Sequence, residues 1–129
     1  MGDEDKKGSI QSYRDLRVWQ AGMELAADCY RLTQRCPKEE LWGLTSQIRR
    51  CVGSVPANIA EGYGRNGRGE FIQFLRIAQG SLKELETHLL LSVRLQIARS
   101  ASVEPLLVQC ETEGKQLRAL IRSLQAKRG

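Results

Sequence analysis

Apolar residues recur every three or four positions in four separate segments of this chain, and this spacing limits its possible folds more than any other feature. The third segment shows the pattern most clearly, with Phe71, Leu75, Ala78, Leu82, Leu85, Leu89 and Val93 at intervals of three and four. Because an α-helix has about 3.6 residues per turn, such residues share one helix face. No run alternates apolar and polar residues as a half-buried strand does. The sequence therefore predicts an all-α protein.

Proline and glycine separate the four segments. Pro37 ends the first, and a glycine-rich stretch over residues 62–69 separates the second from the third. We expect helices over residues 15–35, 38–63 and 69–98, and a fourth capped by Ser102 with Pro105 in its first turn. Asp15 is the expected cap of the first helix, and Pro56 predicts a kink in the second near residues 52–55. Residues 1–12 are expected to be a disordered tail, and residues 13–126 a single domain.

The fourth segment keeps the same apolar period as the third. Its expected core residues are Val103, Leu107, Cys110, Gly114, Leu117, Ile121 and Leu124. The second segment contributes Leu41, Leu44, Ile48, Val52, Val55 and Ile59. This spacing favours nearly antiparallel, left-handed packing. The predicted architecture is an up-down-up-down antiparallel four-helix bundle.

The first segment carries two neighbouring apolar stripes, whereas one stripe is enough for a bundle core. One stripe consists of Leu16, Trp19, Met23, Ala26 and Tyr30, and the other of Val18, Gly22, Leu25, Cys29 and Leu32. We assign the second stripe, with Val18, Gly22 and Leu25, to contact with another subunit. Trp42, which lies off the main stripe of the second helix, is assigned to the same interface. Small residues on the second helix also fit self-association.

The sequence offers no catalytic, cofactor or metal site that we can assign. Its four cysteines contain no Cys-x-x-Cys pair, and it has only one histidine, His88. Glu84 precedes His88 by four residues and is interpreted as its helical ion-pair partner, while Glu61 is expected to pair with an arginine or to fix the turn. The string Gly62-x-Gly64-x-x-Gly67 matches a dinucleotide-binding fingerprint only literally, because a helix rather than a strand precedes it. We expect a non-enzymatic, cytoplasmic protein with no membrane segment.

Basic residues form several clusters on this chain, whose formal net charge is +5. Lys115, Arg118 and Arg122 share one stripe of the last helix, Lys127 and Arg128 extend it, and no acidic residue follows Glu113. Arg65 and Arg68 lie beside the start of the third helix, and Arg49 and Arg50 are adjacent on the second. We assign these clusters to nucleic-acid phosphates. For Arg49 and Arg50, a solvated polar face is the favoured alternative. For the last helix, helix-dipole complementation has the same weight as phosphate contact.

Two blocks of sequence resemble a known signature. Residues 55–65 read Val-Pro-Ala-Asn-Ile-Ala-Glu-Gly-Tyr-Gly-Arg, and residues 80–86 read Gly-Ser-Leu-Lys-Glu-Leu-Glu. They resemble the four-helix-bundle family of 23S rRNA intervening-sequence proteins, to which the accessory variability proteins of diversity-generating retroelements are similar. The resemblance covers residues 13–124. It implies a homo-oligomer, with relatives that form a barrel-like homopentamer, and it identifies the fold better than an activity.

Two functions remain open at this stage. The first is an oligomeric adaptor that binds structured RNA or other nucleic acid through its basic stripes, with a reverse transcriptase as a partner implied by the retroelement relatives. The second is a protein-binding oligomeric scaffold whose basic bias is incidental. A less favoured third is an enzyme with a site at a subunit junction around Glu61. The dependence of nucleic-acid binding on salt distinguishes the first two.

Overall fold

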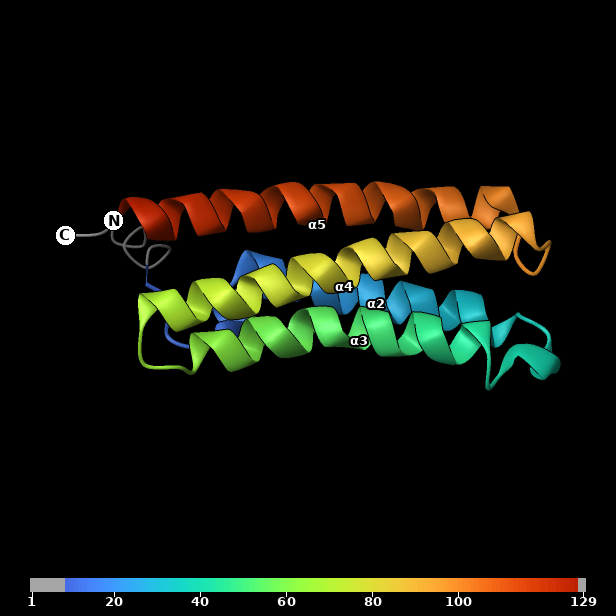
Figure 1. The fold of residues 1–129 in the computed structure, drawn as a ribbon, viewed down its shortest axis with the longest axis horizontal. Coiled ribbons are helices and arrows are strands. Elements are labelled where there is room, and N and C mark those ends of the chain that lie inside the picture. Colours follow the sequence, from blue (N-terminus) through green and yellow to red (C-terminus); the bar gives the residue numbers. More distant parts are fainter. Residues whose placement is uncertain (1–8, 128–129) are drawn as a thin grey trace.

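The computed structural model describes residues 9–127 and contains four long helices with no strand among those residues. Helix α2 covers Arg17–Gln34, α3 covers Leu44–Tyr63, α4 covers Arg68–Arg94 and α5 covers Ser100–Ala126. Short 3-10 helices, η1 (Tyr13–Asp15) and η2 (Lys38–Glu40), precede α2 and α3. Successive long helices run in opposite directions (Figure 1). The predicted up-down-up-down bundle is therefore confirmed for the single chain.

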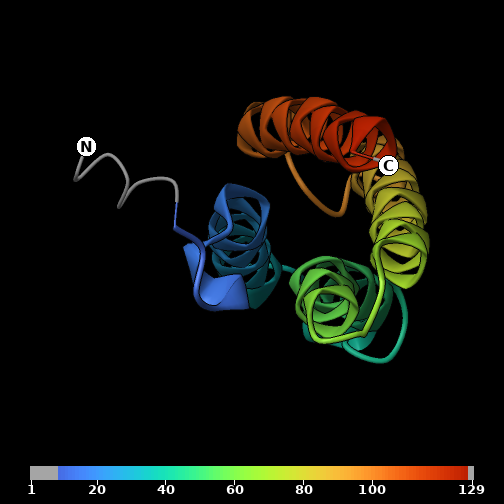
Figure 2. The same ribbon diagram turned by 90° about the vertical axis from the view of Figure 1, so that its left-hand side faces the viewer.

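The helices form a closed cycle of neighbours. Helix α3 packs against α2 and α4, and α5 packs against α4 and α2. Seen along the bundle, the helices follow one another around it in the order α2, α3, α4 and α5 (Figure 2). The interior is aliphatic, with Ile48, Val52, Val55 and Ile59 from α3 and Leu75, Leu82, Leu85 and Leu89 from α4 at 2% exposure or less. The predicted core stripes of α3 and α4 are confirmed, except that Leu41 precedes α3 and is exposed.

Helix α2 buries the stripe that we assigned to another subunit. Val18 and Leu25 are 4% and 0% exposed within the single chain, and Gly22 is buried beside them. Met23 and Tyr30 of the other stripe are 46% and 44% exposed. The assignment of the two stripes is thus corrected. Their spacing predicts which residues share a face, but both faces have the same period, so the spacing does not identify the inward one.

Several predicted helix ends differ from the observed ones. Ser12, rather than Asp15, caps the first turn, and the Asp15 carboxylate accepts a hydrogen bond from the Ser12 backbone N–H as the other half of a capping box. Residues 38–43 form η2 and a turn, because Gly43 has a backbone conformation outside the helical region. Helix α4 ends at Arg94, and α5 begins at Ser100 with Arg99 as its cap, so Ser102 is helical and Pro105 lies beyond the first turn.

The register of α5 also differs from the prediction at two positions. Val103, Cys110, Leu117 and Ile121 face the core as expected. The remaining inward positions belong to Leu106 and Glu113, one residue earlier than the predicted Leu107 and Gly114. A carboxylate is almost never buried without a partner, so an apolar pattern does not suggest Glu113. This residue is the largest departure of the core from its sequence pattern.

The first half of the resemblance signature forms the close crossing of α3 and α4. A β-carbon placed on Gly62 would lie 2.6 Å from Phe74 Cβ, closer than two such atoms approach. One and two turns earlier, Asn58 Nδ2 donates to Ser54 Oγ at 2.9 Å, and Ser54 Oγ shares a hydrogen bond with Ser81 Oγ at 2.7 Å. These residues bring two helices into contact and satisfy the polar atoms there. This role explains why the signature identifies a fold rather than a reaction.

Candidate nucleic-acid interface

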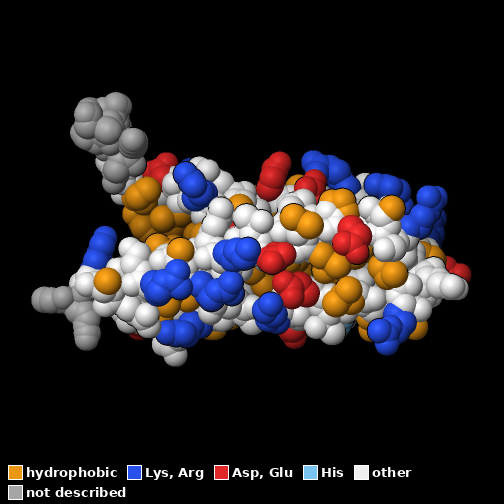
Figure 3. Space-filling model, turned by 90° about the horizontal axis from the view of Figure 1, so that it is seen from above, with side chains coloured by type: hydrophobic (Ala, Val, Ile, Leu, Met, Phe, Trp, Pro, Cys, Tyr) orange, Lys and Arg blue, Asp and Glu red, His pale blue; other side chains and the backbone are white. Residues whose placement is uncertain are grey.

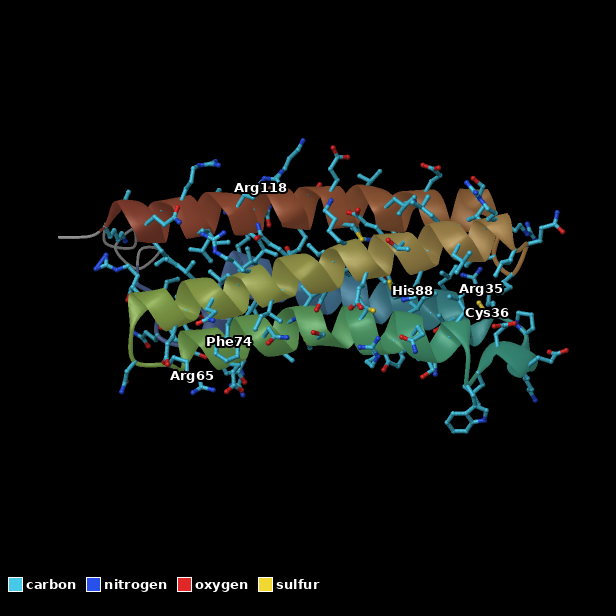
Figure 4. All side chains as sticks on the ribbon, in the orientation of Figure 1. Arg35, Cys36, Arg65, Phe74, His88 and Arg118 are labelled. Atoms are coloured by element: carbon cyan, nitrogen blue, oxygen red, sulfur yellow. The ribbon has the colours of Figure 1, made fainter. Side chains whose placement is uncertain are left out.

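The two arginines at the turn between α3 and α4 differ in their contacts: one binds neighbouring side chains, and the other is exposed. Arg65 donates to Glu61 Oε2 at 2.7 Å, as predicted for Glu61, and its guanidinium stacks 4.9 Å from the centre of the Phe74 ring (Figure 4). Arg68 is exposed as the first residue of α4. The glycine-rich string is a helix–helix turn, so the dinucleotide reading is excluded. Arg65 therefore fixes the turn, whereas Arg68 presents its charge to solvent.

The two adjacent arginines of α3 make different contacts, since Arg49 is partly buried against α2 and Arg50 lies on the surface. Arg49 Nε donates to Thr33 Oγ1 of α2 at 2.8 Å, and its guanidinium lies 4.7 Å from the centre of the Tyr30 ring. Arg50 is exposed and donates to Gln47 Oε1 at 2.6 Å. Arg49 is thus part of the α2–α3 packing, and neither the solvated-face nor the phosphate interpretation describes it. Arg50 alone keeps its place in the predicted basic surface.

The basic stripe of α5 lies on the surface, as predicted. Lys115 is paired loosely with Glu111 at 3.8 Å, and both side chains are about two-thirds exposed. Within residues 9–127, no carboxylate lies within ion-pair distance of Arg118 or Arg122, and both side chains are exposed. Lys127 continues the stripe, while Arg128 lies outside the described residues. The exposed, largely unneutralised cations of α5 form the best candidate for contact with an anion.

A groove of about 670 Å³ runs between α4 and α5 beside this stripe. Gly80 of α4 and Gly114 of α5 contribute to its lining, and the missing side chains leave it open. Lys83, Lys115 and Arg118 supply cations to the groove, whereas Glu86 and Glu111 supply carboxylates. Figure 3 views the molecule from the α5 side. Basic side chains gather over the half that holds the C-terminal part of α5, acidic ones lie near the middle, and a further basic group lies at the opposite end.

Two further cations of α4 belong to this surface and escaped the sequence analysis. Arg76 precedes Lys83 by seven residues, so both lie on the same face of α4, and both are exposed. Lys83 is paired with Glu86 at 3.2 Å. The sequence signal was present as a seven-residue spacing between basic residues. It gained meaning only when α5 was seen beside the same face of α4. We call Arg76, Lys83, Lys115, Arg118 and Arg122 the α4–α5 basic surface.

The described residues contain no assembly typical of a catalytic or metal site. Residues 9–127 include no group of three histidine, cysteine or acidic side chains that could hold a metal ion. Glu84 accepts from Cys51 Sγ at 3.5 Å, and His88 Nδ1, on α4, is buried without a hydrogen-bond partner among those residues (Figure 4). The predicted Glu84–His88 pair is therefore not formed. Burial raises the pKa of Cys29 and Cys110 to about 12, which disfavours reactive thiolates.

The predicted subunit contacts are placed very differently. Val18, Gly22 and Leu25 are interior, as described above, whereas Trp42 is 87% exposed in the turn between η2 and α3. Leu41 beside it is also exposed. Of the four predicted interface residues, only Trp42 is available to a partner. No helix in the described part of the chain is long and apolar enough to cross a membrane.

Comparison with known proteins gives a family and solved structures of similar fold. The family model described as "23S rRNA-intervening sequence protein" matches residues 14–119. A crystal structure from Bacteroides thetaiotaomicron, titled as a protein of unknown function from the S23 ribosomal protein family, superposes with a TM-score of 0.73 at 25% identity. The superposition covers 81% of this chain and 97% of that one. No curated protein matches the chain. Neither description indicates an enzyme.

Proposed function

We propose that this chain, which belongs to the family of 23S rRNA-intervening sequence proteins, is a non-enzymatic adaptor that binds structured RNA through the α4–α5 basic surface. The observation that carries this proposal is the exposed row of Lys115, Arg118 and Arg122, in which the two arginines have no carboxylate partner among residues 9–127. The family description links the chain to ribosomal RNA by name and does not specify a binding surface. The exposed cations of α5 are our reason for choosing this surface.

The arrangement suits a phosphate backbone better than a base edge. Arginine and lysine side chains on one helix face bind phosphates without reading sequence. The same helix presents Arg118 one turn from Lys115 and one turn from Arg122, so its cations repeat along a line of about 10 Å. Lys83 lines the groove beside this line, and Arg76 lies two turns earlier on the same face of α4. Binding of this kind depends on charge spacing and responds strongly to salt.

Assembly of several copies would strengthen such binding. A homo-oligomer, with a pentamer as the form that the family resemblance implies, would present the surface once per subunit and convert weak contacts into avid ones. The exposed Trp42 supports an interface near η2. A reverse transcriptase is a further proposed partner, by analogy with the retroelement accessory proteins that the family resembles, and we expect the same surface to hold its RNA.

A second candidate function is a protein-binding scaffold, and one observation favours it. Leu90 lines the α4–α5 groove and is 55% exposed, and Val108 on α5 is 60% exposed. The carboxylates of Glu86 and Glu111 lie in the same groove. An exposed apolar area with flanking charges of both signs is typical of a protein partner. Nucleic-acid binding tests decide between the two functions.

The decisive experiment compares two triple variants with equal changes in net charge. The test variant carries Lys115→Gln, Arg118→Gln and Arg122→Gln. The control carries Arg35→Gln, Arg94→Gln and Arg99→Gln, which remove exposed cations at the other end of the bundle. Each is titrated against structured RNA and duplex DNA at several salt concentrations.

We expect the test variant to weaken binding and to reduce the slope of log affinity against log salt by about 2, since each lost contact accounts for roughly 0.7 to 0.9. The control should change the slope by less than half as much. Equal effects of the two variants would mean that net charge alone attracts RNA. Absence of binding by the unaltered protein at low salt would give the scaffold function first place.

A further inference from the structure

Glu113 is the one carboxylate that the described part of the bundle buries without a partner. Its side chain projects inward from α5 and is 1% exposed. Neither Oε1 nor Oε2 has a hydrogen-bond partner among residues 9–127. Leaving a carboxylate unpaired in a core is costly, so such a group is retained only if it spends its time protonated or if it meets a partner that the closed bundle does not offer.

Three helices meet at this carboxylate. A β-carbon placed on Gly22 of α2 would lie 3.3 Å from Glu113 Oε2 and 3.5 Å from Pro56 Cβ of α3. Glycine on α2 thus provides the space that the carboxylate occupies. Proline on α3 has no N–H, so the Val52 carbonyl oxygen has no donor four residues ahead in its own helix. Residues of α2 and α3 thus surround the inward carboxyl group of α5.

No charged group from the neighbouring helices compensates Glu113. The inward residues of α3 and α4 at this level, Val52, Val55, Ala78 and Leu82, are apolar. The thiol of Cys110, one turn earlier on α5, lies near Glu113 and also near the thiol of Cys29 on α2. Across the same boundary between α2 and α5, Gln109 Nε2 donates to Asp28 Oδ2 at 3.0 Å. We call this boundary, from Asp28 and Gln109 to Gly22 and Glu113, the α2–α5 seam.

We propose that Glu113 is a proton-operated latch, which holds α5 against α2 and α3 while its carboxyl group is protonated and lets the α2–α5 seam open when the proton is lost. The protonated acid is neutral, so burying it in the apolar interior costs much less free energy than burying the carboxylate. The carboxylate has only acceptor oxygens, and no donor of the described residues reaches it. Loss of the proton therefore favours a state in which water reaches the side chain.

The direction of the pH effect follows from burial. Burial raises the pKa of Glu113 from its usual value near 4.5 to about 8. The closed state therefore holds a proton that the open state has already released at neutral pH. The latch is fully effective below the ordinary pKa, weakens as the pH rises toward 8, and reaches a constant level above it. This range includes the physiological one.

The cysteines of the chain provide a local test. Cys29 and Cys110 are buried at the α2–α5 seam, whereas Cys51 is buried on α3 against Glu84 of α4. Labelling of the full-length protein with a small alkylating reagent, followed by mass spectrometry, gives a rate for each thiol. The rate in the unaltered protein is divided by the rate in Glu113→Gln at each pH, so that the intrinsic pH dependence of thiol reactivity cancels. Glu111→Gln, an exposed neighbour on α5, serves as the matched control.

We expect the ratio for Cys29 and Cys110 to rise at least tenfold between pH 6 and pH 8, while the ratio for Cys51 changes less than twofold. Unchanged ratios would overturn the latch, and so would a parallel rise at Cys51, which indicates global unfolding. If Glu113→Gln does not fold, Glu113→Met replaces it as the reference. A carbon-13 titration of the Glu113 carboxyl group in the unaltered protein supplies an independent decision, because a midpoint near 4.5 contradicts the proposal.

Discussion

The α3–α4 hairpin and the α2–α5 seam of this bundle differ in how they accommodate buried polar groups. In the hairpin, Gly62 admits the Phe74 side chain at contact distance, and Ser54, Asn58 and Ser81 satisfy one another. At the seam, Gly22 admits the carboxylate of Glu113, whose oxygens have no partner among the described residues. Both regions use a glycine to bring helices together. They differ in whether the buried polar side chains nearby are satisfied by hydrogen bonds.

This difference assigns different roles to the two halves of the molecule. The hairpin is the tightly packed part, since the hydroxyl and amide groups at its crossing are hydrogen-bonded and its helices are in close contact. Helix α5 has the proposed RNA-binding cations on its outer face and an uncompensated acid on its inner face. A helix that is easily released on one side and charged on the other is suited to respond to a ligand.

The largest expected effect concerns Glu113 and global stability. Relative to Glu113→Gln, the free energy of unfolding of the unaltered protein should fall by roughly 2 to 4 kcal/mol between pH 5 and pH 8, because only the folded state holds the proton over that range. Urea denaturation followed by circular dichroism at each pH measures it. Glu111→Gln, with an exposed carboxylate, should run parallel to the unaltered protein. Parallel curves for all three proteins would remove the contrast between seam and hairpin.

A smaller effect is expected at the helix crossing of the hairpin. Gly62→Ala should destabilise the protein by about 1 to 3 kcal/mol, because a β-carbon would lie 2.6 Å from Phe74 Cβ and force the helices apart. Gly53→Ala is the matched control on the same helix, since nothing lies within 4 Å of its β-carbon position. That change should stabilise the protein by about 1 kcal/mol through helix propensity. Thermal unfolding compares them, and equal shifts would show that Gly62 makes no close contact.

The smallest expected effect concerns the hydroxyl pair of the hairpin. Ser81→Ala should cost about 1 kcal/mol, because the Ser54 hydroxyl loses its interhelical partner at a partly buried site. Thr87→Ala on the exposed side of α4 removes a hydroxyl that bonds only within its own helix. Its cost in the same denaturation experiment should be near zero. A loss for Thr87→Ala as large as that for Ser81→Ala would mean that the network does not hold the hairpin together.

The sequence predicted the bundle because periodicity suffices to define helices and their faces. The stripes of α3 and α4 were identified correctly, since each helix has one apolar stripe. On α2 the choice between Val18 and Met23 failed, because two adjoining stripes have the same period. Arg49 was misread because an arginine on a polar helix face gives no sign that Thr33 and Tyr30 lie across from it. Such contacts depend on helix rotation, which a single sequence does not specify.

Glu113 illustrates the complementary limit. Its position fits the inward period of α5 as well as Leu106 or Leu117 does, yet the predicted stripe placed the neighbouring Gly114 in the core. Nothing within α5 distinguishes a buried acid from a surface one. The information lies in Gly22 and Pro56, which are far away in sequence and leave the space that the carboxylate fills. The basic surface was predicted only in part, because the cations of α4 lie near those of α5 only in the folded chain.

Native-state hydrogen exchange at residue resolution tests the central contrast most directly. The unaltered protein is measured at pH 6 and pH 8, and opening free energies are compared for buried amides of α5 around Leu117 and of α3 and α4 around Val55 and Leu82. At pH 8 we expect the α5 amides to have a lower opening free energy than the amides of α3 and α4, which stay protected. The difference between the two opening free energies should narrow at pH 6 and in Glu113→Gln. One common opening free energy for all four helices at both pH values would contradict this expectation.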